Sequence, residues 1–188
     1  MHIFADKNNY KVLLIHIPKC AGTSCGQFLH KYATNHKWYN LNDGYYNDHI
    51  PLHVAKKIVD FDYSIAFVRN PYDRFASKYS YLTEFDYHPG YKGCTIDQFL
   101  DQRINLKDPG CWTPEGWRKQ IEYIEGVDQI FKIEDHDPIK VLNHITGLNG
   151  KQEIANKSKK VFLTNTQKEK VYNIFKEDFE RLYYANLY

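Results

Sequence analysis

Apolar residues recur along the chain in blocks that alternate between two periods. The aliphatic run Val12–Ile15 is short enough for a buried strand, and the apolar positions of Cys25–Tyr32 then fall at i, i+3, i+4 and i+7, which is helical spacing. The same order returns with a strand over Tyr63–Val68 and a helix for which Asn70 is the expected N-cap. Strands that alternate with helices predict an α/β fold with a mainly parallel sheet flanked by helices.

The rest of the pattern predicts further strands and helices and contains no linker or repeat. We expect a short strand at 37–39, a helix at 52–59, helices at 96–104 and 115–124, a strand at 130–133, and helices at 137–146 and 167–184. Glycine and proline concentrate at 88–117, which indicates an excursion from the core of the kind that carries substrate contacts. Trp112 and Trp117 there are equally compatible with stacking on a sugar and with anchoring the loop. The pattern as a whole predicts a single domain over residues 1–188.

The sequence HIPKCAGTS joins the first predicted strand to the first predicted helix. Free N–H groups and the helix dipole attract anions at a helix N-terminus, and the small residues Ala21 and Gly22 let the backbone approach an anion closely. Lys19 supplies a full charge, while Thr23 and Ser24 supply hydroxyl donors, and either hydroxyl can cap the helix. These residues favour a phosphate-binding loop over an ordinary turn. Lys19 precedes Gly22, so the loop lacks the residue order of a Walker A motif.

This loop resembles the 5′-phosphosulfate loop of sulfotransferases, particularly the carbohydrate O-sulfotransferases of sulfotransferase family 2. The family's second signature is a strand that ends in Arg-x-Pro, with a serine eight residues after the arginine. The segment IAFVRNPYDRFASKY contains this signature as Arg69 and Ser77. The later blocks WTPEGWRKQIEYI, IFKIED and NKSKK also follow the family's order, so the resemblance covers roughly residues 11–184.

The resemblance implies an enzyme that moves the sulfuryl group from 3′-phosphoadenosine 5′-phosphosulfate (PAPS) to a hydroxyl of an acceptor, with a carbohydrate as the expected class. It implies a P-loop-like three-layer core and no metal requirement. Lys19 would stabilise charge on the leaving phosphate, and Arg69 with Ser77 would hold the 3′-phosphate. The full set of implied PAPS contacts is Lys19, Cys20, Ala21, Gly22, Thr23, Ser24, Arg69, Ser77, Lys157 and Ser158, the last two only by their position in the later blocks. Gln120 is implied as a contact to the acceptor or the donor, again only by block position.

The general base is expected to be His49, because histidine accepts a proton near neutral pH. Bacterial members of the family carry a Gly-His-x-Pro block at this distance from the arginine, and here Asp48 stands in place of the glycine. A histidine held by a backbone group in a loop is equally compatible with the sequence. His53, His16 and Glu84 are the alternative bases, and His16 is more simply explained as a support for the loop.

Composition and charge limit the possible partners and location. The formal net charge is +2, so we expect no nucleic-acid partner. No apolar run reaches membrane-spanning length and the first residues do not resemble a signal peptide, so the expected location is cytoplasmic. An excised Golgi-luminal domain is the alternative, because Golgi members of the family carry an N-terminal anchor. The sequence does not predict an oligomeric state.

The cysteines and carboxylates do not predict a metal site. None of the cysteines forms a C-x-x-C pair, and no carboxylates have the spacing of a magnesium site. Cys94 and Cys111 could bridge, although free thiols are favoured for a cytosolic protein. Two other functions compete with sulfuryl transfer: a P-loop-like nucleotide kinase, and a non-catalytic nucleotide-binding or scaffold protein with the same fold.

Overall fold

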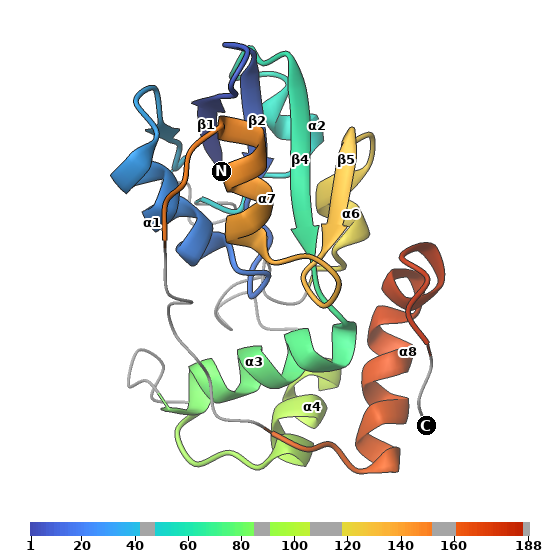
Figure 1. Ribbon diagram of the computed structural model, residues 1–188. Coiled ribbons are helices and arrows are strands. Elements are labelled where there is room, and N and C mark those ends of the chain that lie inside the picture. The colour runs from blue at the N-terminus through green and yellow to red at the C-terminus, as the bar shows by residue number, and fades with distance from the viewer. Residues whose placement is uncertain (42–47, 85–90, 106–117, 152–160, 186–188) are drawn as a thin grey trace. The chain divides into compact units, whose positions relative to one another are not determined.

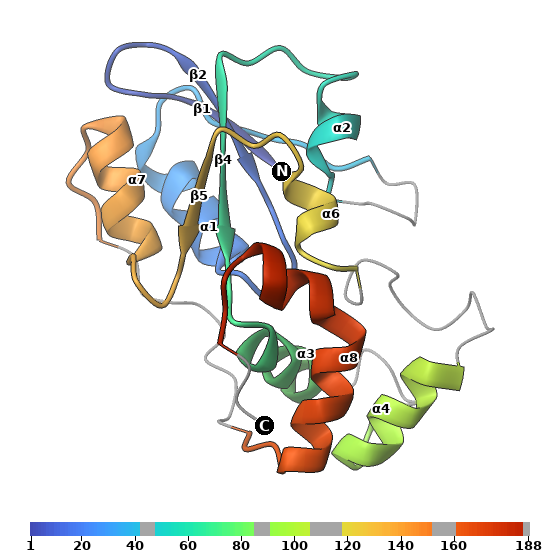
Figure 2. The same ribbon diagram turned by 90° about the vertical axis from the view of Figure 1, so that its right-hand side faces the viewer.

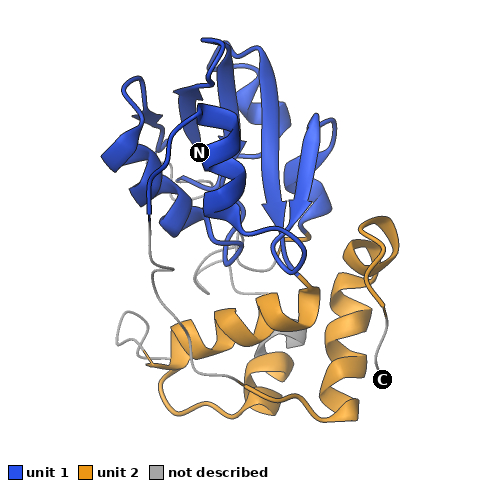
Figure 3. Cartoon of the chain, viewed as in Figure 1, with its two compact units in different colours: residues 1–69, 120–156 blue, residues 70–119, 157–188 orange. Residues whose placement is uncertain are grey.

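The computed structural model describes residues 1–41, 48–84, 91–105, 118–151 and 161–185. The chain divides into two compact units, which Figure 3 distinguishes by colour. Unit 1 comprises Met1–Arg69 and Gln120–Asn156, and unit 2 comprises Asn70–Lys119 and Lys157–Tyr188. Each unit has its own cluster of buried apolar side chains. That the whole chain forms a single domain stays a prediction.

Unit 1 is built on a five-stranded sheet with the strand order β3-β1-β2-β4-β5 (Figure 1). Strands β2, β4 and β5 are parallel to one another, whereas β1 is antiparallel to both β2 and β3. The sheet is therefore mixed, and the expected mainly parallel arrangement holds only for β2, β4 and β5. The strands are β1 His2–Ala5, β2 Lys11–Ile15, β3 Lys37–Trp38, β4 Tyr63–Val68 and β5 Gln129–Lys132.

Strand β1 is the element that the sequence analysis did not predict. A turn stabilised by its own side chain joins β1 to β2: the Asp6 carboxylate accepts from the backbone N–H groups of Asn8 (2.8 Å) and Tyr10 (2.9 Å). Asn9 has φ 66°, which asparagine tolerates better than most residues. Because this turn is tight, β1 returns antiparallel to β2 and makes the sheet mixed.

Helices cover both faces of this sheet, as Figure 2 shows. Helices α1 (Gly22–Tyr32) and α7 (Pro138–Thr146) lie on one face, and α2 (Leu52–Ala55) and α6 (Ile121–Ile124) lie on the other. The strand residues alternate accordingly: Leu14 packs in the cluster that contains residues of α1 and α7, while its neighbours in β2 are buried on the opposite face. This arrangement agrees with a three-layer core for unit 1.

The short helices differ most from their predicted bounds. Helix α2 ends at Ala55, although a helix was predicted over 52–59, and Ile58 is 44% exposed. Helix α6 occupies only the end of the predicted range 115–124, of which residues 115–117 lie outside the described residues. Helix α7 agrees with prediction, because Asp137 caps its start and Gly147 ends it with φ 71°.

Unit 2 contains α3 (Pro71–Glu84), α4 (Ile96–Asn105) and α8 (Asn165–Arg181), which surround an aromatic core. The predicted start of α3 is confirmed, since the Asn70 Oδ1 accepts from the Tyr72 N–H at 2.9 Å. Helix α8 begins before the predicted Gln167, because Thr164 and Gln167 form a capping box.

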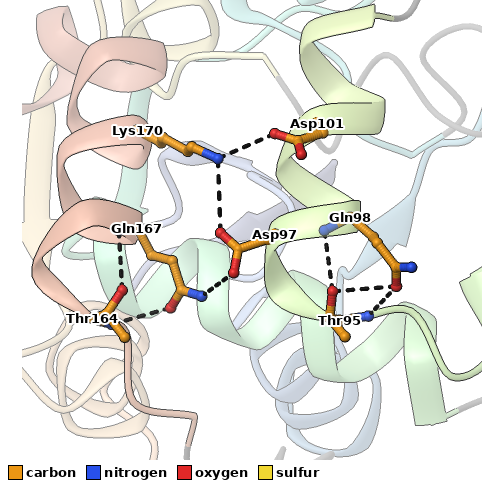
Figure 4. Close-up of polar contacts among 7 residues, drawn as sticks. All are labelled: Thr95, Asp97, Gln98, Asp101, Thr164, Gln167 and Lys170. Carbon is orange, nitrogen blue, oxygen red and sulfur yellow. Dashed lines mark hydrogen bonds and ion pairs between the residues drawn. The ribbon is translucent and has the colours of Figure 1, made fainter.

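Polar contacts join α4 to α8 within unit 2 (Figure 4). Gln167 donates to the Asp97 carboxylate at 2.9 Å, and the Lys170 ammonium lies 3.1 Å from Asp101 and 3.7 Å from Asp97. The N-terminus of α4 has its own capping box, formed by Thr95 and Gln98. The first turns of both helices are thus fixed by side chains that the sequence places three residues apart.

Two further sequence predictions can be compared with the structure. Cys20, Cys25 and Cys94 are free thiols, and Cys111 lies outside the described residues. Among the helices of the described residues, none combines the length and the apolar character needed to cross a membrane.

Candidate functional site

The two predicted anion-binding segments of unit 1 meet at one edge of the sheet. Strands β2 and β4 are parallel neighbours, so the loop after Ile15 and the residue after Val68 leave the sheet at the same edge. The Arg69 Nη1 accordingly donates to the Lys19 carbonyl oxygen at 3.4 Å. The parallel pairing of two strands that precede separate motifs therefore brings Lys19 and Arg69 together.

The loop after β2 has an unusual backbone conformation. Lys19 (φ 67°) and Ala21 (φ 63°) both adopt left-handed conformations, which cost an L-residue about 1–2 kcal/mol each. Left-handed Ala21 followed by helical Gly22 is the alternation of handedness that forms an anion-binding nest of backbone N–H groups. Strain of this kind is typical of functional segments.

Helix α1 starts earlier than a Thr23 or Ser24 cap would place it. Ala21 is the N-cap residue, and its side chain makes no capping hydrogen bond. The capping prediction is therefore wrong: both hydroxyl residues lie in the first turn, where Thr23 is exposed and Ser24 is 3% exposed. A helix that has no N-cap side chain leaves backbone N–H groups at its start, which suit an external anion.

Gly22 is required by close packing against His16. A Cβ atom at Gly22 would lie 1.8 Å from the His16 Cδ2, which no side chain tolerates. His16 itself is 7% exposed. The buried imidazole therefore fixes the position of the α1 N-terminus, in agreement with the expectation that His16 supports the loop.

The loop and the end of β4 form a compact positive site. Lys19 and Arg69 are both half-buried. Burial, and secondly the nearby Arg69 guanidinium, lower the pKa of Lys19 to about 8. A bound anion would relieve the repulsion between these cations, so the electrostatics favour a phosphate- or sulfate-bearing ligand.

Gln120 holds the end of β4 in a way that sequence reasoning missed. Its fully buried carboxamide accepts from the Arg69 N–H and donates to the Arg69 carbonyl oxygen, each at 2.8 Å. The Cys20 thiol also contacts the Gln120 Oε1 at 3.2 Å. Gln120 therefore fixes the position of Arg69 and contacts the loop through Cys20. The two residues lie 51 positions apart, so no local signal in the sequence could have predicted the contact.

A second cluster adjoins the loop and consists of His16, Asp48 and His49. The His16 Nδ1 lies 3.0 Å from the Asp48 Oδ2, and the His49 Nε2 lies 3.6 Å from the Asp48 Oδ1. Although burial opposes ionisation of Asp48, the adjacent imidazoles hold the pKa of its carboxyl below the usual range. Asp48, which the sequence analysis considered only as a departure from the family pattern, thus joins the two histidines.

The tautomer of His49 follows from its second hydrogen bond. The His49 Nδ1 lies 2.9 Å from the His16 carbonyl oxygen, and since a carbonyl only accepts, Nδ1 carries the proton. In the neutral ring Nε2 is then the basic nitrogen. The alternative bases lie elsewhere: His53 is exposed on α2, and Glu84 is exposed at the end of α3 in unit 2.

Cys20 and Ser77, two further predicted PAPS contacts, belong to different units. Cys20 is buried in the loop at 2% exposure, and Ser77 is buried on α3 in unit 2 at 6% exposure. Lys157 and Ser158 lie outside the described residues, as do Trp112 and Trp117. The structure therefore brings together the loop, Arg69, His16 and His49 in unit 1.

Comparison with known proteins identifies the family. No curated protein and no solved structure matches the chain significantly. Residues 1–121, well over half of the 188, match the Sulfotransferase family. The matched range contains the loop, Arg69, the histidine cluster and Gln120. The chain therefore belongs to the sulfotransferase family, as the resemblance to sulfotransferase family 2 indicated.

Proposed function

We propose that this sulfotransferase takes the sulfuryl group from PAPS and transfers it to a hydroxyl of a carbohydrate. The observation that carries the proposal is the anion site of unit 1, where an uncapped helix N-terminus, Lys19 and Arg69 lie at the carboxyl ends of two parallel strands. PAPS carries anionic groups at both its 5′ and 3′ positions. Two adjacent cations from separate motifs suit such a ligand better than a single phosphate.

The reaction requires alignment, charge stabilisation and removal of one proton. The acceptor oxygen attacks sulfur, the bond from sulfur to the 5′-phosphate oxygen breaks, and 3′-phosphoadenosine 5′-phosphate leaves with the electron pair. We assign the 5′-phosphosulfate to the α1 N-terminus, where the backbone N–H groups of the first turn and the Thr23 and Ser24 hydroxyls donate to it. Lys19 stabilises the negative charge that develops on the leaving phosphate.

Arg69 and Ser77 are assigned to the 3′-phosphate by their spacing in the family signature. A guanidinium forms two parallel hydrogen bonds with a phosphate, which suits Arg69 for this role. Lys157 and Ser158 are assigned to the nucleotide only by their block position. The P-loop-like character of the site rests on the strand, loop and helix order of β2 and α1.

His49 is the proposed general base. Its Nδ1 is committed to the His16 carbonyl, so the basic Nε2 can accept the acceptor's proton. The Asp48 carboxylate, 3.6 Å from Nε2, stabilises the imidazolium that results. This arrangement supports His49 over His53, for which the structure offers no carboxylate partner among the described residues.

Calorimetric titration with 3′-phosphoadenosine 5′-phosphate tests the proposal, with ATP and adenosine 5′-phosphate as competitors that lack the 3′-phosphate. We expect selective binding of the bisphosphate and a loss of about 10–100-fold in affinity for Arg69→Ala, the range for a charged hydrogen bond. Arg181→Ala, which removes an exposed arginine at the end of α8, is the matched control. Equal binding of ATP, or equal loss in both variants, would contradict the proposal and favour a kinase or scaffold.

A further inference from the structure

The cluster of His16, Asp48 and His49 has the composition of a transition-metal site. It offers two imidazole nitrogens and one carboxylate oxygen, and these ligand atoms all lie within 4.8 Å of one another. Two histidines and one carboxylate are a common ligand set for Zn²⁺ with an open coordination position. Hard ions such as Mg²⁺ and Ca²⁺ prefer oxygen ligands and would not select this set.

The separations fit a common ion between the ligands. With zinc–ligand bonds of about 2.0–2.1 Å and tetrahedral angles, two ligand atoms lie about 3.3 Å apart. The His16 Nδ1 lies 3.0 Å from the Asp48 Oδ2 and the His49 Nε2 lies 3.6 Å from the Asp48 Oδ1, so each histidine faces one oxygen of the carboxylate, and the ligand atoms of the three residues lie within 4.8 Å of one another. Binding of a common ion therefore requires side-chain rotations that bring the three ligand atoms to this separation.

A simple ion pair explains the His16 contact less well. The His16 Nδ1 is buried and, despite its 3.0 Å separation from Asp48, has no hydrogen-bond partner of acceptable geometry among the described residues. A buried nitrogen normally has such a partner. A metal ion held jointly with Asp48 would use the lone pair of that nitrogen.

The surroundings of the histidines fix the orientation that ligands need. The His49 Nδ1 donates to the His16 carbonyl, which is the outer-shell bond that ligating histidines usually make. The His16 ring is held against Gly22, where no Cβ intervenes. Asp48 and His49 are 25% and 23% exposed, so an ion can enter from solvent and keep a water ligand.

We infer that His16, Asp48 and His49 form a binding site for a divalent transition-metal ion of the Zn²⁺ class. This site was not predicted from the sequence, in which the spacing of the cysteines and carboxylates indicated no metal. One consequence rests on the proposed function: an ion on the His49 Nε2 occupies the lone pair that accepts the acceptor's proton. Zn²⁺ should then inhibit sulfuryl transfer rather than support it.

Direct binding measurements on the full chain test the inference. After treatment with a chelator and its removal, Zn²⁺ is titrated calorimetrically, and Co²⁺ is titrated while its visible absorption reports the coordination geometry. We expect about one ion per chain and the absorption of four-coordinate Co²⁺. Asp48→Asn, which keeps the shape of the side chain, and His49→Ala should each reduce affinity by roughly 100-fold or more.

His144→Ala is the matched control, because it removes an exposed histidine on α7 outside the cluster. Circular dichroism and thermal midpoints verify that each variant is folded. If His49→Ala is unstable, the Zn²⁺ affinity of Asp48→Asn relative to wild type tests the site. Absence of binding, or equal affinity in wild type and Asp48→Asn, would overturn the metal site.

Nucleotide titration separates this inference from the proposed function. Binding of 3′-phosphoadenosine 5′-phosphate without Zn²⁺ binding would refute the metal site alone, whereas Zn²⁺ binding without nucleotide selectivity would refute the proposed donor alone. If both bind and Zn²⁺ leaves transfer unchanged, His49 is not the base although the metal site stands.

Discussion

Lys19 is the residue whose protonation most directly controls the charge of the anion site. Its pKa of about 8, lowered by burial and by Arg69, means that it is mostly protonated at neutral pH and neutral above about pH 9. An anionic ligand binds the protonated form better, so affinity must fall as pH rises through this value. The lowered pKa therefore predicts an alkaline limit to donor binding.

We expect the affinity for 3′-phosphoadenosine 5′-phosphate to fall about 10-fold between about pH 7 and about pH 9, since only about a tenth of Lys19 is then protonated. The phosphates, with a second pKa of about 6, only gain charge over this range and so cannot cause the fall. Lys19→Arg should retain binding with a flat profile, because arginine stays protonated. Calorimetry at several pH values measures the affinities of wild type and of Lys19→Arg. A similar decline in Lys19→Arg would assign the pH dependence to another group.

Gln120 stabilises the fold through its hydrogen bonds to the backbone N–H and carbonyl of Arg69. Gln120→Ala leaves the Arg69 N–H and carbonyl without their side-chain partner, and each such buried group costs about 1–3 kcal/mol. We expect a loss of about 2–4 kcal/mol in the free energy of unfolding, measured by urea denaturation. Gln129→Ala, an exposed position on β5, should change stability little.

Gln120→Glu separates the two hydrogen bonds of that side chain. The carboxylate keeps an acceptor for the Arg69 N–H but has no donor for the Arg69 carbonyl. Its stability should therefore lie below wild type. If all the Gln120 variants match wild type in stability and nucleotide affinity, the carboxamide does not position Arg69.

At the scale of elements, the α1 N-terminus depends on contact between a helix and a strand end. Gly22→Ala introduces a methyl group into the space of the His16 ring, and overpacking of this kind costs about 1–3 kcal/mol. We expect that decrease in unfolding free energy from denaturant titration. Thr23→Ala, an exposed change in the same turn, is the control. In a His16→Ala background the additional effect of Gly22→Ala should shrink, and an undiminished effect would contradict the packing argument.

The elements that the sequence predicted well are those specified by local pattern. Strands β2 and β4 are continuous apolar runs, and α3 has a capping asparagine and a proline at its first position, so neighbours in sequence suffice to define them. Strand β1 is defined instead by pairing with β2 through the Asp6 turn. It was therefore missed in the sequence.

The residues of the candidate site also fall into two groups, those that local sequence motifs predict and those that only tertiary contacts define. Lys19 and Arg69 belong to motifs of contiguous residues, so the sequence alone predicted them and the parallel pairing of β2 and β4 then brought them together. Gln120 and Asp48 act through contacts with residues far away in sequence. Asp48 departs from the Gly-His-x-Pro block of the family, and only the tertiary structure shows its two histidine partners.

At the scale of the whole molecule, the chain has two apolar cores, one in each unit. The match to the sulfotransferase family spans residues 1–121 and so includes segments of both units. The anion site described above belongs to unit 1 alone. Because a ligand that binds only the folded state stabilises it, donor binding should be visible in the unfolding of the protein as well as at the site.

We expect 3′-phosphoadenosine 5′-phosphate at about 100 times its dissociation constant to stabilise the folded protein by about 2.7 kcal/mol. For a chain of this length that corresponds to a rise of about 5–10 °C in the thermal midpoint, measurable by scanning calorimetry. ATP at the same concentration should shift the midpoint less, because it lacks the 3′-phosphate that Arg69 is proposed to bind. Lys19→Ala should reduce the shift, since the nest would retain its backbone donors but lose the charge beside them. Equal shifts with ATP and the bisphosphate would show that the 3′-phosphate adds nothing to binding, and the assignment of Arg69 would then be wrong.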